Sequence, residues 1–228
     1  MAAMVPHQIL PPVADGRGTR SNKRFLDAMA PEGEDPDMGH ADLIDNEELR
    51  TPRLSLRRPN DADIDTIYRI HSDPRAYAHN PADALATRAE AEERYQRWNE
   101  HWNQHGFGYW TVHSQMRTHQ PLGFCGIKLM QLHGRTILNL FYRLDPLAWG
   151  NGVATEAATT VVSWATAHLP DYPIIARVRP DNAASLKVAA RAGLRRAPQL
   201  DTDGEDGLDW IFTLSWPGDA EPVRDPRP

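Results

Sequence analysis

A glycine-bearing loop ahead of an amphipathic helix is the segment of this sequence whose residue types best suit chemistry. It runs from Asp145 to Glu156 and contains Gly150 and Gly152. Glycines let a backbone approach a ligand closely, and the first N–H groups of a helix carry partial positive charge without partners inside the helix. The pattern predicts an anion site suited to a phosphate or pyrophosphate. A tight turn without a ligand is the alternative that an isolated Gly-x-Gly leaves open.

Two familiar phosphate-binding loops fit this segment poorly. A Walker A loop requires a lysine followed by serine or threonine, and the stretch Asn151-Gly152-Val153 supplies no lysine. A dinucleotide fingerprint requires its first glycine directly after a strand, whereas Pro146 intervenes here. The fingerprint also requires Gly or Ala three residues beyond its second glycine, where this chain has Thr155.

The loop resembles the acyl-CoA loop of the GNAT acetyltransferases, whose pattern is Gln or Arg, two residues, Gly, one residue, then Gly or Ala. Gly152 and Ala154 occupy the last two positions of that pattern. Trp149 stands at the first position and departs from the general pattern. With this tryptophan the loop resembles the branch named for ribosomal-protein N-terminal acetyltransferases (RimJ/RimL-like), where Trp-Gly-x-Gly-x-Ala-Thr-Glu-Ala is typical. The chain has this pattern from Trp149 to Ala157.

Two further motifs carry the same resemblance. Asn182-Ala183-Ala184-Ser185 follows a predicted strand and opens a helix that ends at Gly193-Leu194. The stretch Thr51–Arg57 matches the Thr-x-Arg-Leu-x-Leu-Arg opening of the branch. Three ordered motifs are far more specific than the loop alone, and they cover about Thr51 to Trp216.

The resemblance implies a single GNAT domain with acetyl-CoA between two splayed parallel strands, Leu138 to Leu144 and Ile174 to Val178. The backbone of the first strand would pair with the pantetheine arm, and the loop N–H groups with the Thr155 hydroxyl would hold the pyrophosphate. Asn182 would hydrogen-bond the pantetheine, although it is also a good N-cap for the helix that follows. The cofactor-binding residues expected from the resemblance are Leu140, Phe141, Tyr142, Leu144, Trp149, Gly150, Asn151, Gly152, Val153, Ala154, Thr155, Asn182 and Ser185. We expect no metal.

Acetyl transfer to an amine requires a neutral amine, stabilisation of the tetrahedral oxyanion and a proton for the leaving thiolate. The resemblance implies that Ser185 protonates the thiolate, a modest help because a thiol of pKa about 8.5 leaves readily. The oxyanion donor is expected to be a backbone N–H between Leu140 and Tyr142.

The general base is the open point of the site. Many family members carry a glutamate where this chain has Asn139, whose amide cannot usefully accept a proton, and Phe141 replaces a frequent glycine. The catalytic candidates besides Ser185 are Tyr142 and Glu156. Glu156 in the first turn of a helix also simply complements the helix dipole.

Other groups near the expected acceptor side are less specific. His71 and His79 lie in or beside the loop after the first predicted helix and are either bases or solvated loop histidines. The acidic turn Asp201, Asp203, Glu205 and Asp206 is either solvated or attracts a cationic amine.

The missing base bears on the choice of acceptor. An α-amino group of pKa about 7.7 to 8.0 is roughly one-tenth neutral at pH 7, whereas a lysine of pKa about 10.4 is neutral only about once in 2,500 molecules. We therefore expect an α-amine, at a protein N-terminus or on a small molecule, to be preferred over a lysine side chain.

Hydrophobic periodicity predicts the elements that position these groups. An α/β (α+β) fold is expected: a strand and helix from Leu54 to about His71, a helix opened by a capping box at Thr87 and Glu90, and then an antiparallel meander from Tyr109 to Leu144. A helix, a strand, a second helix and two final strands, Arg195 to Leu200 and Leu208 to Leu214, complete a mixed, mostly antiparallel sheet flanked by helices. Trp98, Trp102 and Trp110 are expected in the core.

Composition sets the boundaries and excludes several classes. The chain has 228 residues, a net charge of −6 and a single cysteine, which excludes a disulfide scaffold. Eight acidic residues and no Lys or Arg fall in 31 to 49, so residues 50 to 216 are close to neutral and give no reason to expect nucleic acid. We expect an acidic, proline-rich disordered extension at 1–48, the GNAT domain at 49–216 and a flexible tail at 217–228.

We expect no apolar run long enough to span a membrane and no signal peptide, which predicts a cytoplasmic protein. We also expect a monomer or a homodimer. The main alternative to an enzyme is an acyl-CoA binding or sensing module that kept the loop and lost the chemistry. A scaffold that docks through its acidic head is the third reading.

Overall fold

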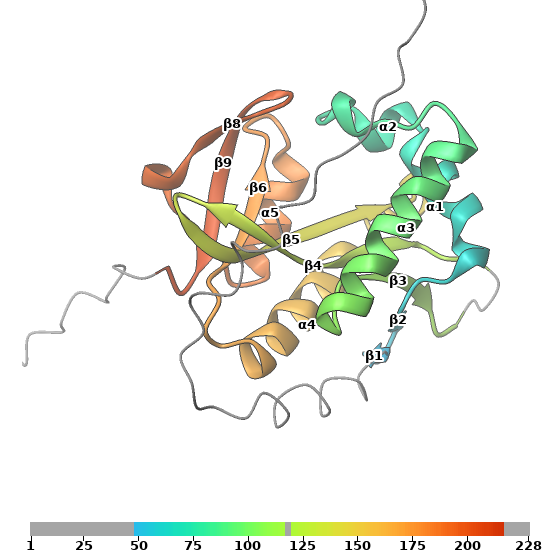
Figure 1. Ribbon diagram of the computed structural model, residues 1–228, viewed down its shortest axis with the longest axis horizontal. Coiled ribbons are helices and arrows are strands. Elements are labelled where there is room, and N and C mark those ends of the chain that lie inside the picture. The colour runs from blue at the N-terminus through green and yellow to red at the C-terminus, as the bar shows by residue number, and fades with distance from the viewer. Residues whose placement is uncertain (1–47, 117–119, 217–228) are drawn as a thin grey trace, which may run out of the picture. The chain divides into compact units, whose positions relative to one another are not determined.

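The computed structural model describes residues 48–116 and 120–216. Nine strands form the sheet in the order β1-β2-β3-β4-β5-β6-β9-β7, with β8 paired to β9 (Figure 1). The strands are β1 (Glu48–Arg50), β2 (Leu54–Arg57), β3 (Tyr109–Ser114), β4 (Gly123–Leu132), β5 (Arg135–Leu144), β6 (Ile174–Val178), β7 (Arg195–Arg196), β8 (Thr202–Gly204) and β9 (Gly207–Leu214). The helices are α1 (Ile64–His71), α2 (Pro74–Tyr77), α3 (Arg88–His105), α4 (Val153–His168) and α5 (Ala183–Arg191).

All strand pairs are antiparallel except β5 with β6, which run parallel. Antiparallel neighbours can be joined by a short turn, whereas a parallel pair requires a crossover, and α4 supplies it for β5 and β6. The parallel pairing covers only Leu138 with Ile174 and Asn139 with Ile175, after which the two strands separate. The expected fold class, a mixed sheet of mostly antiparallel strands that splay at the centre and are flanked by helices, is confirmed.

Helix boundaries follow the local chemistry of the sequence. The Thr87 side chain accepts a hydrogen bond from the Glu90 backbone N–H, and the Glu90 carboxylate accepts one from the Thr87 backbone N–H, so the capping box that opens α3 is present. Gly106 ends this helix in the left-handed conformation at φ 73°. Pro74 is the first residue of the short helix α2, and Asp73 is the N-cap of this helix.

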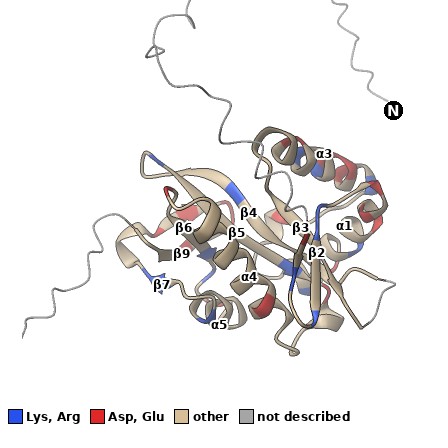
Figure 2. Ribbon diagram, turned by 90° about the horizontal axis from the view of Figure 1, so that it is seen from below, with Lys and Arg blue, Asp and Glu red and all other residues tan. Residues whose placement is uncertain are grey.

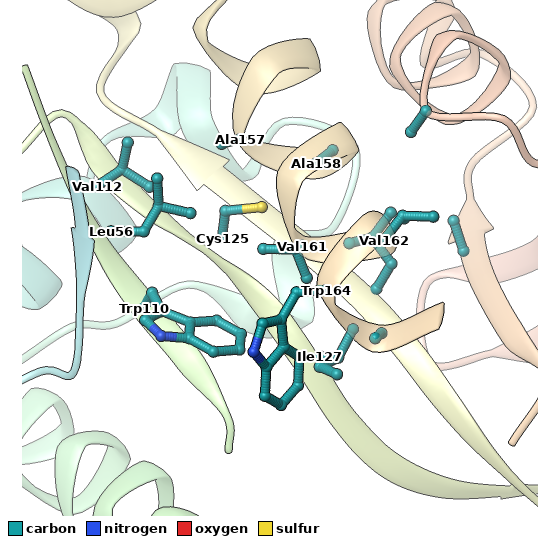
Figure 3. Close-up of a cluster of buried hydrophobic side chains, with 14 of the residues drawn as sticks. Leu56, Trp110, Val112, Cys125, Ile127, Ala157, Ala158, Val161, Val162 and Trp164 are labelled. Atoms are coloured by element: carbon teal, nitrogen blue, oxygen red, sulfur yellow. The ribbon is translucent and has the colours of Figure 1, made fainter. Parts of the chain in front are cut away.

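Two layers of helices enclose the sheet. In Figure 2, α1 and α3 lie on one side of the strands and α4 and α5 on the other. The α4 layer buries the largest apolar cluster, where Trp110 of β3 meets Trp164 of α4 with ring centroids 5.4 Å apart, next to the buried Cys125 (Figure 3). On the α3 side Trp98 packs edge-on against Phe124 at 5.1 Å. The expectation that Trp98, Trp102 and Trp110 are core residues is confirmed, because each is at most 7% exposed.

One predicted strand is wrong in its extent. Only Arg195 and Arg196 pair with β9, and Pro198–Leu200 forms a 3-10 turn instead. Proline has no backbone N–H to donate to a ladder, so the strand cannot continue through position 198. The chain then returns to β9 through the extra strand β8, which together with β9 forms a hairpin whose turn holds Glu205 and Asp206.

The part of the chain that the structure describes contains no helix long and apolar enough to cross a membrane. Residues 1–47 of the expected N-terminal extension and the expected tail at 217–228 lie outside the described residues, whereas Glu48 begins β1. The division of the chain into extension, domain and tail stays a prediction.

Candidate active site

The splay between β5 and β6 leaves backbone groups of β5 facing a gap. The N–H of Leu138 donates to the Pro173 carbonyl at 2.9 Å, on the β6 side of the strand. Backbone polar groups alternate sides along a strand, so those of Leu140 and Tyr142 point to the same side. Beyond Asn139 no residue of β6 pairs with them. These are the groups that the resemblance assigns to the pantetheine arm and to the oxyanion.

A cavity of about 440 Å³, the loop cavity, lies between the end of β5, the glycine-bearing loop and α5. Its lining includes ten of the residues predicted to bind the cofactor: Tyr142, Leu144, Trp149, Gly150, Gly152, Val153, Ala154, Thr155, Asn182 and Ser185. Three predicted residues lie elsewhere. Leu140 and Phe141 line a neighbouring cavity, and Asn151 lines neither, because its carbonyl accepts from Arg53 at 3.1 Å and its amide donates to Trp149.

The loop is shaped by its two glycines. Gly150 and Gly152 have φ of 78° and 74°, a left-handed backbone that side chains rarely adopt. Gly152 is the N-cap of α4 and has no side chain to accept from the first turn. The first N–H groups of α4, at Val153 and Ala154, therefore face the loop cavity without a capping oxygen, which suits an anion.

Four cations on the wall of the loop cavity were missed by the sequence reasoning, and one of them is Arg143 of β5. Arg75 belongs to α2, and Lys187 and Arg191 lie on α5. Lys187 and Arg191 are one helical turn apart, so both face the same way. This spacing after the Asn182 cap was the available signal. Arg75 is held by Asp73 at 2.6 Å.

Asn182 fulfils its capping role in the structure. Its Oδ1 accepts from the Ser185 backbone N–H at 3.0 Å. Since an N–H must donate to an oxygen, this bond fixes the orientation of the amide and leaves Nδ2 directed elsewhere. Asn182 also lines the loop cavity, so the two roles are geometrically compatible.

Tyr142 and Ser185 lie together at the back of the loop cavity. The Tyr142 hydroxyl donates to the Ser185 carbonyl at 3.0 Å. Burial raises the pKa of Tyr142, so its phenol stays protonated at neutral pH. The phenol hydrogen is engaged by the Ser185 carbonyl, so Tyr142 positions the first turn of α5.

The Glu156 carboxylate is hydrogen-bonded by residues that lie far away in the sequence. Its carboxylate accepts from the Thr51 hydroxyl at 2.5 Å and from the Arg53 Nε at 2.6 Å. Burial raises the pKa of Glu156, but the hydrogen bonds from Thr51 and Arg53 outweigh burial and hold it below its ordinary value. Both carboxylate oxygens therefore connect α4 to the segment between β1 and β2.

The two histidines named as candidate bases have different surroundings. His71 is fully buried, and its pKa is lowered well below the ordinary value by burial and by the charge of Arg143, so it stays neutral. Its Nδ1 lies 2.9 Å from the Ile67 carbonyl. His79 lines the loop cavity, with Nδ1 3.3 Å from an Asp181 carboxylate oxygen.

A second cavity of about 290 Å³, the splay cavity, lies beyond the separated strands. Of the predicted acidic turn, Glu205 and Asp206 line it, whereas Asp201 pairs with Arg196 at 2.5 Å. Asp203 does not line it. Five residues line both cavities, namely Asn80, Tyr142, Arg143, Asn182 and Ser185.

Comparison with known proteins agrees with this geometry. The family model for the acetyltransferase (GNAT) domain matches residues 53–195. The chain is 30% identical to the uncharacterised protein YkkB of Bacillus subtilis over 149 residues, 64% of this chain and 84% of that protein.

Among solved structures, an acetyltransferase of Agrobacterium tumefaciens has a TM-score of 0.62 and 25% identity, covering 74% of this chain and 94% of that one. RimL, a ribosomal L7/L12 alpha-N-protein acetyltransferase in complex with coenzyme A, shares the fold with a TM-score of 0.59 at 16% identity, over 74% and 97% of the two chains. The expected resemblance to the GNAT acetyltransferases is thereby confirmed, and the chain belongs to this family.

Proposed function

We propose that this GNAT acetyltransferase moves an acetyl group from acetyl-CoA to a primary amine, preferably an α-amino group, by direct attack in a ternary complex. The observation that carries the proposal is the meeting of the loop cavity and the splay cavity at Tyr142, Asn182 and Ser185. A cofactor in the first cavity and an amine in the second would meet there without an enzyme-bound acetyl intermediate.

The loop cavity offers suitable groups for the cofactor. The N–H groups at the start of α4 and the cations Lys187 and Arg191 would hold the pyrophosphate. The backbone of Leu140 and Tyr142, with the Asn182 amide, would hold the pantetheine arm. A backbone N–H of Leu140 or Tyr142 would donate to the oxyanion as the amine nitrogen attacks the thioester carbonyl.

Proton transfer would be divided between two side chains. Ser185 would pass a proton to the leaving thiolate and take one back from water, and the attacking amine would lose a proton to His79 or to water. His79 is the proposed acceptor because it precedes Asn80, which lines both cavities, and lies beside Asp181, whose carboxylate can orient the imidazole. Glu156 is less suited, because Arg53 and Thr51 already engage its carboxylate.

The acceptor preference is tested by thiol release with two peptides. One has a free α-amine and no lysine, and the other has an acetylated N-terminus and one lysine. We expect faster turnover of the first because its amine is neutral far more often. Faster turnover of the lysine peptide would overturn the preference. Acetyl-CoA binding without thiol release on any amine would instead favour the acyl-CoA binding module.

A further inference from the structure

A third cavity, the basic pocket, lies on the α3 side of the sheet and has a volume of about 220 Å³. Its charged lining consists of Arg94 and Arg97 from α3, Lys128 from β4 and one acidic residue, Asp83. Figure 2 shows basic positions on both α3 and β4. Three positive side chains against one negative side chain give the pocket a net positive charge.

The single carboxylate of the basic pocket is already shared. Asp83 lies 2.9 Å from Arg94 and 2.9 Å from Arg143, which are only 13% and 8% exposed. Two largely buried guanidinium groups therefore compete for one carboxylate, and the Arg143 Nη1 atom is buried without a hydrogen-bond partner. Asp83 cannot also neutralise the other cations of the pocket.

Arg97 and Lys128 have no carboxylate partner within 4.0 Å in residues 48–116 and 120–216. Arg97 is exposed and Lys128 is half-buried, so water reaches both cations in the free protein, and both are available to an anion that enters the pocket. The walls on the other sides are the aromatic rings of Trp98, Tyr109 and Phe141. These rings limit water and strengthen any ionic contact made inside.

The basic pocket adjoins the place where the amine would react. Asp83 and Phe141 line both the basic pocket and the splay cavity. Lys128 is the cross-strand partner of Asn139, the last residue of β5 that pairs with β6. Directly opposed residues have Cβ atoms about 5 Å apart, so Lys128 stands next to the start of the splay.

We propose that the preferred acceptor is an amine with a carboxylate close to it, and that the basic pocket binds this carboxylate through Arg97 and Lys128 while the amine reaches the splay cavity. This inference rests on the proposed function and names its substrate class. A carboxylate would supply the missing partner of the unpaired cations, whereas a neutral acceptor would leave them unpaired.

The test uses acceptors that differ only in one charge. Aspartate amide with asparagine amide and glutamate amide with glutamine amide are the single-residue pairs. Tripeptide amides with Glu or Gln at the second or third position are the peptide pairs. We expect kcat/KM for at least one acidic member to exceed that of its neutral partner at least tenfold. A preference confined to single residues indicates a small acceptor, and one that extends to the tripeptides indicates an acidic chain end.

Variants of the basic pocket test whether Arg97 and Lys128 cause the preference for acidic acceptors. Lys128→Met and Arg97→Met should each reduce the acid-to-amide ratio at least threefold and leave kcat/KM for the neutral acceptor within twofold. Lys128→Arg should restore most of the ratio. Arg135→Met removes an exposed charge from β5 outside all three cavities and should leave the ratio unchanged.

Equal rates for acidic and neutral acceptors in the wild-type protein, or a ratio that survives the double variant of Arg97 and Lys128, would overturn the inference. If no acceptor releases thiol although acetyl-CoA binds, the proposed function fails. The pocket is then judged by calorimetry on the CoA-loaded protein: tighter binding of the acidic members, lost in the double variant, supports it, and equal binding contradicts it.

Discussion

Asn182 offers a way to separate a structural role from a ligand-binding role. Its Oδ1 caps α5 by accepting from the Ser185 N–H at 3.0 Å. Removing such a cap in Asn182→Ala should cost about 1 kcal/mol of unfolding free energy. In a domain of this size that lowers Tm by about 3 °C. Asn182→Ser keeps a neutral N-cap of similar quality, so its Tm should stay within about 1 °C of wild type.

The serine variant loses the amide donor that we assign to the pantetheine arm. One hydrogen bond contributes about 0.5 to 1.5 kcal/mol, so Kd for acetyl-CoA should rise about 2- to 13-fold in Asn182→Ser. Thermal unfolding without ligand measures the cap, and isothermal titration with acetyl-CoA measures the contact. Wild-type affinity in Asn182→Ser, together with lower stability in Asn182→Ala, would refute the ligand contact and leave capping alone.

Three more predictions follow from individual contacts. Ser185→Ala should lower kcat only about tenfold, because a thiolate leaves readily without much help. Tm should stay nearly unchanged, because the bond that caps α5 uses the Ser185 backbone N–H. A thousandfold loss of steady-state kcat, or no loss, would contradict this role. The ordinary pKa of a glutamate is 4.5, and the lower pKa of Glu156 in the folded protein contributes stability that is fully present above pH 4.5 and is lost as the pH falls through the folded-state pKa. Glu156→Gln should therefore make Tm depend less on pH below 4.5. An unchanged dependence of Tm on pH would contradict this role. Gly126→Ala places a Cβ 2.2 Å from the Gly108 carbonyl oxygen and should lower the free energy of urea unfolding by more than about 2 kcal/mol. The Cβ of Gly134→Ala meets nothing within 4 Å, so this variant should lose only about 1 kcal/mol because of its positive φ. Equal losses in the two variants would contradict the role of packing at Gly126.

Local sequence chemistry was sufficient for the loop and most elements. The capping box at Thr87, the glycines at 150 and 152 and the Asn182 cap each depend on neighbours within a few residues, and the structure contains all of them. The prediction of a strand through Leu200 is wrong, because hydrophobic alternation takes no account of the backbone N–H that Pro198 lacks.

Contacts between distant segments could not be predicted. Glu156 looked available as a base, but its partners Thr51 and Arg53 lie more than 100 residues away in the chain. The basic pocket combines Arg97 of α3 with Lys128 of β4, and no spacing in the sequence announces that meeting. Its charge emerges only when the helix packs on the sheet.

The loop at Gly152 allows the most direct test of the account. A Cβ there would meet only the Arg53 side chain, at 3.6 Å, and Asn and Asp tolerate a left-handed backbone better than other residues. Gly152→Asn is therefore the uncharged match for Gly152→Asp, which adds a negative charge beside the predicted pyrophosphate site.

The decisive measurement is thermal unfolding of the wild-type protein and both Gly152 variants, with acetyl-CoA and with buffer. Acetyl-CoA at about 100 times its Kd should add about 2.7 kcal/mol of unfolding free energy to the wild-type protein. We predict most of this stabilisation in Gly152→Asn and little of it in Gly152→Asp. No stabilisation of the wild-type protein, or equal stabilisation of both variants, would contradict acetyl-CoA binding at this loop.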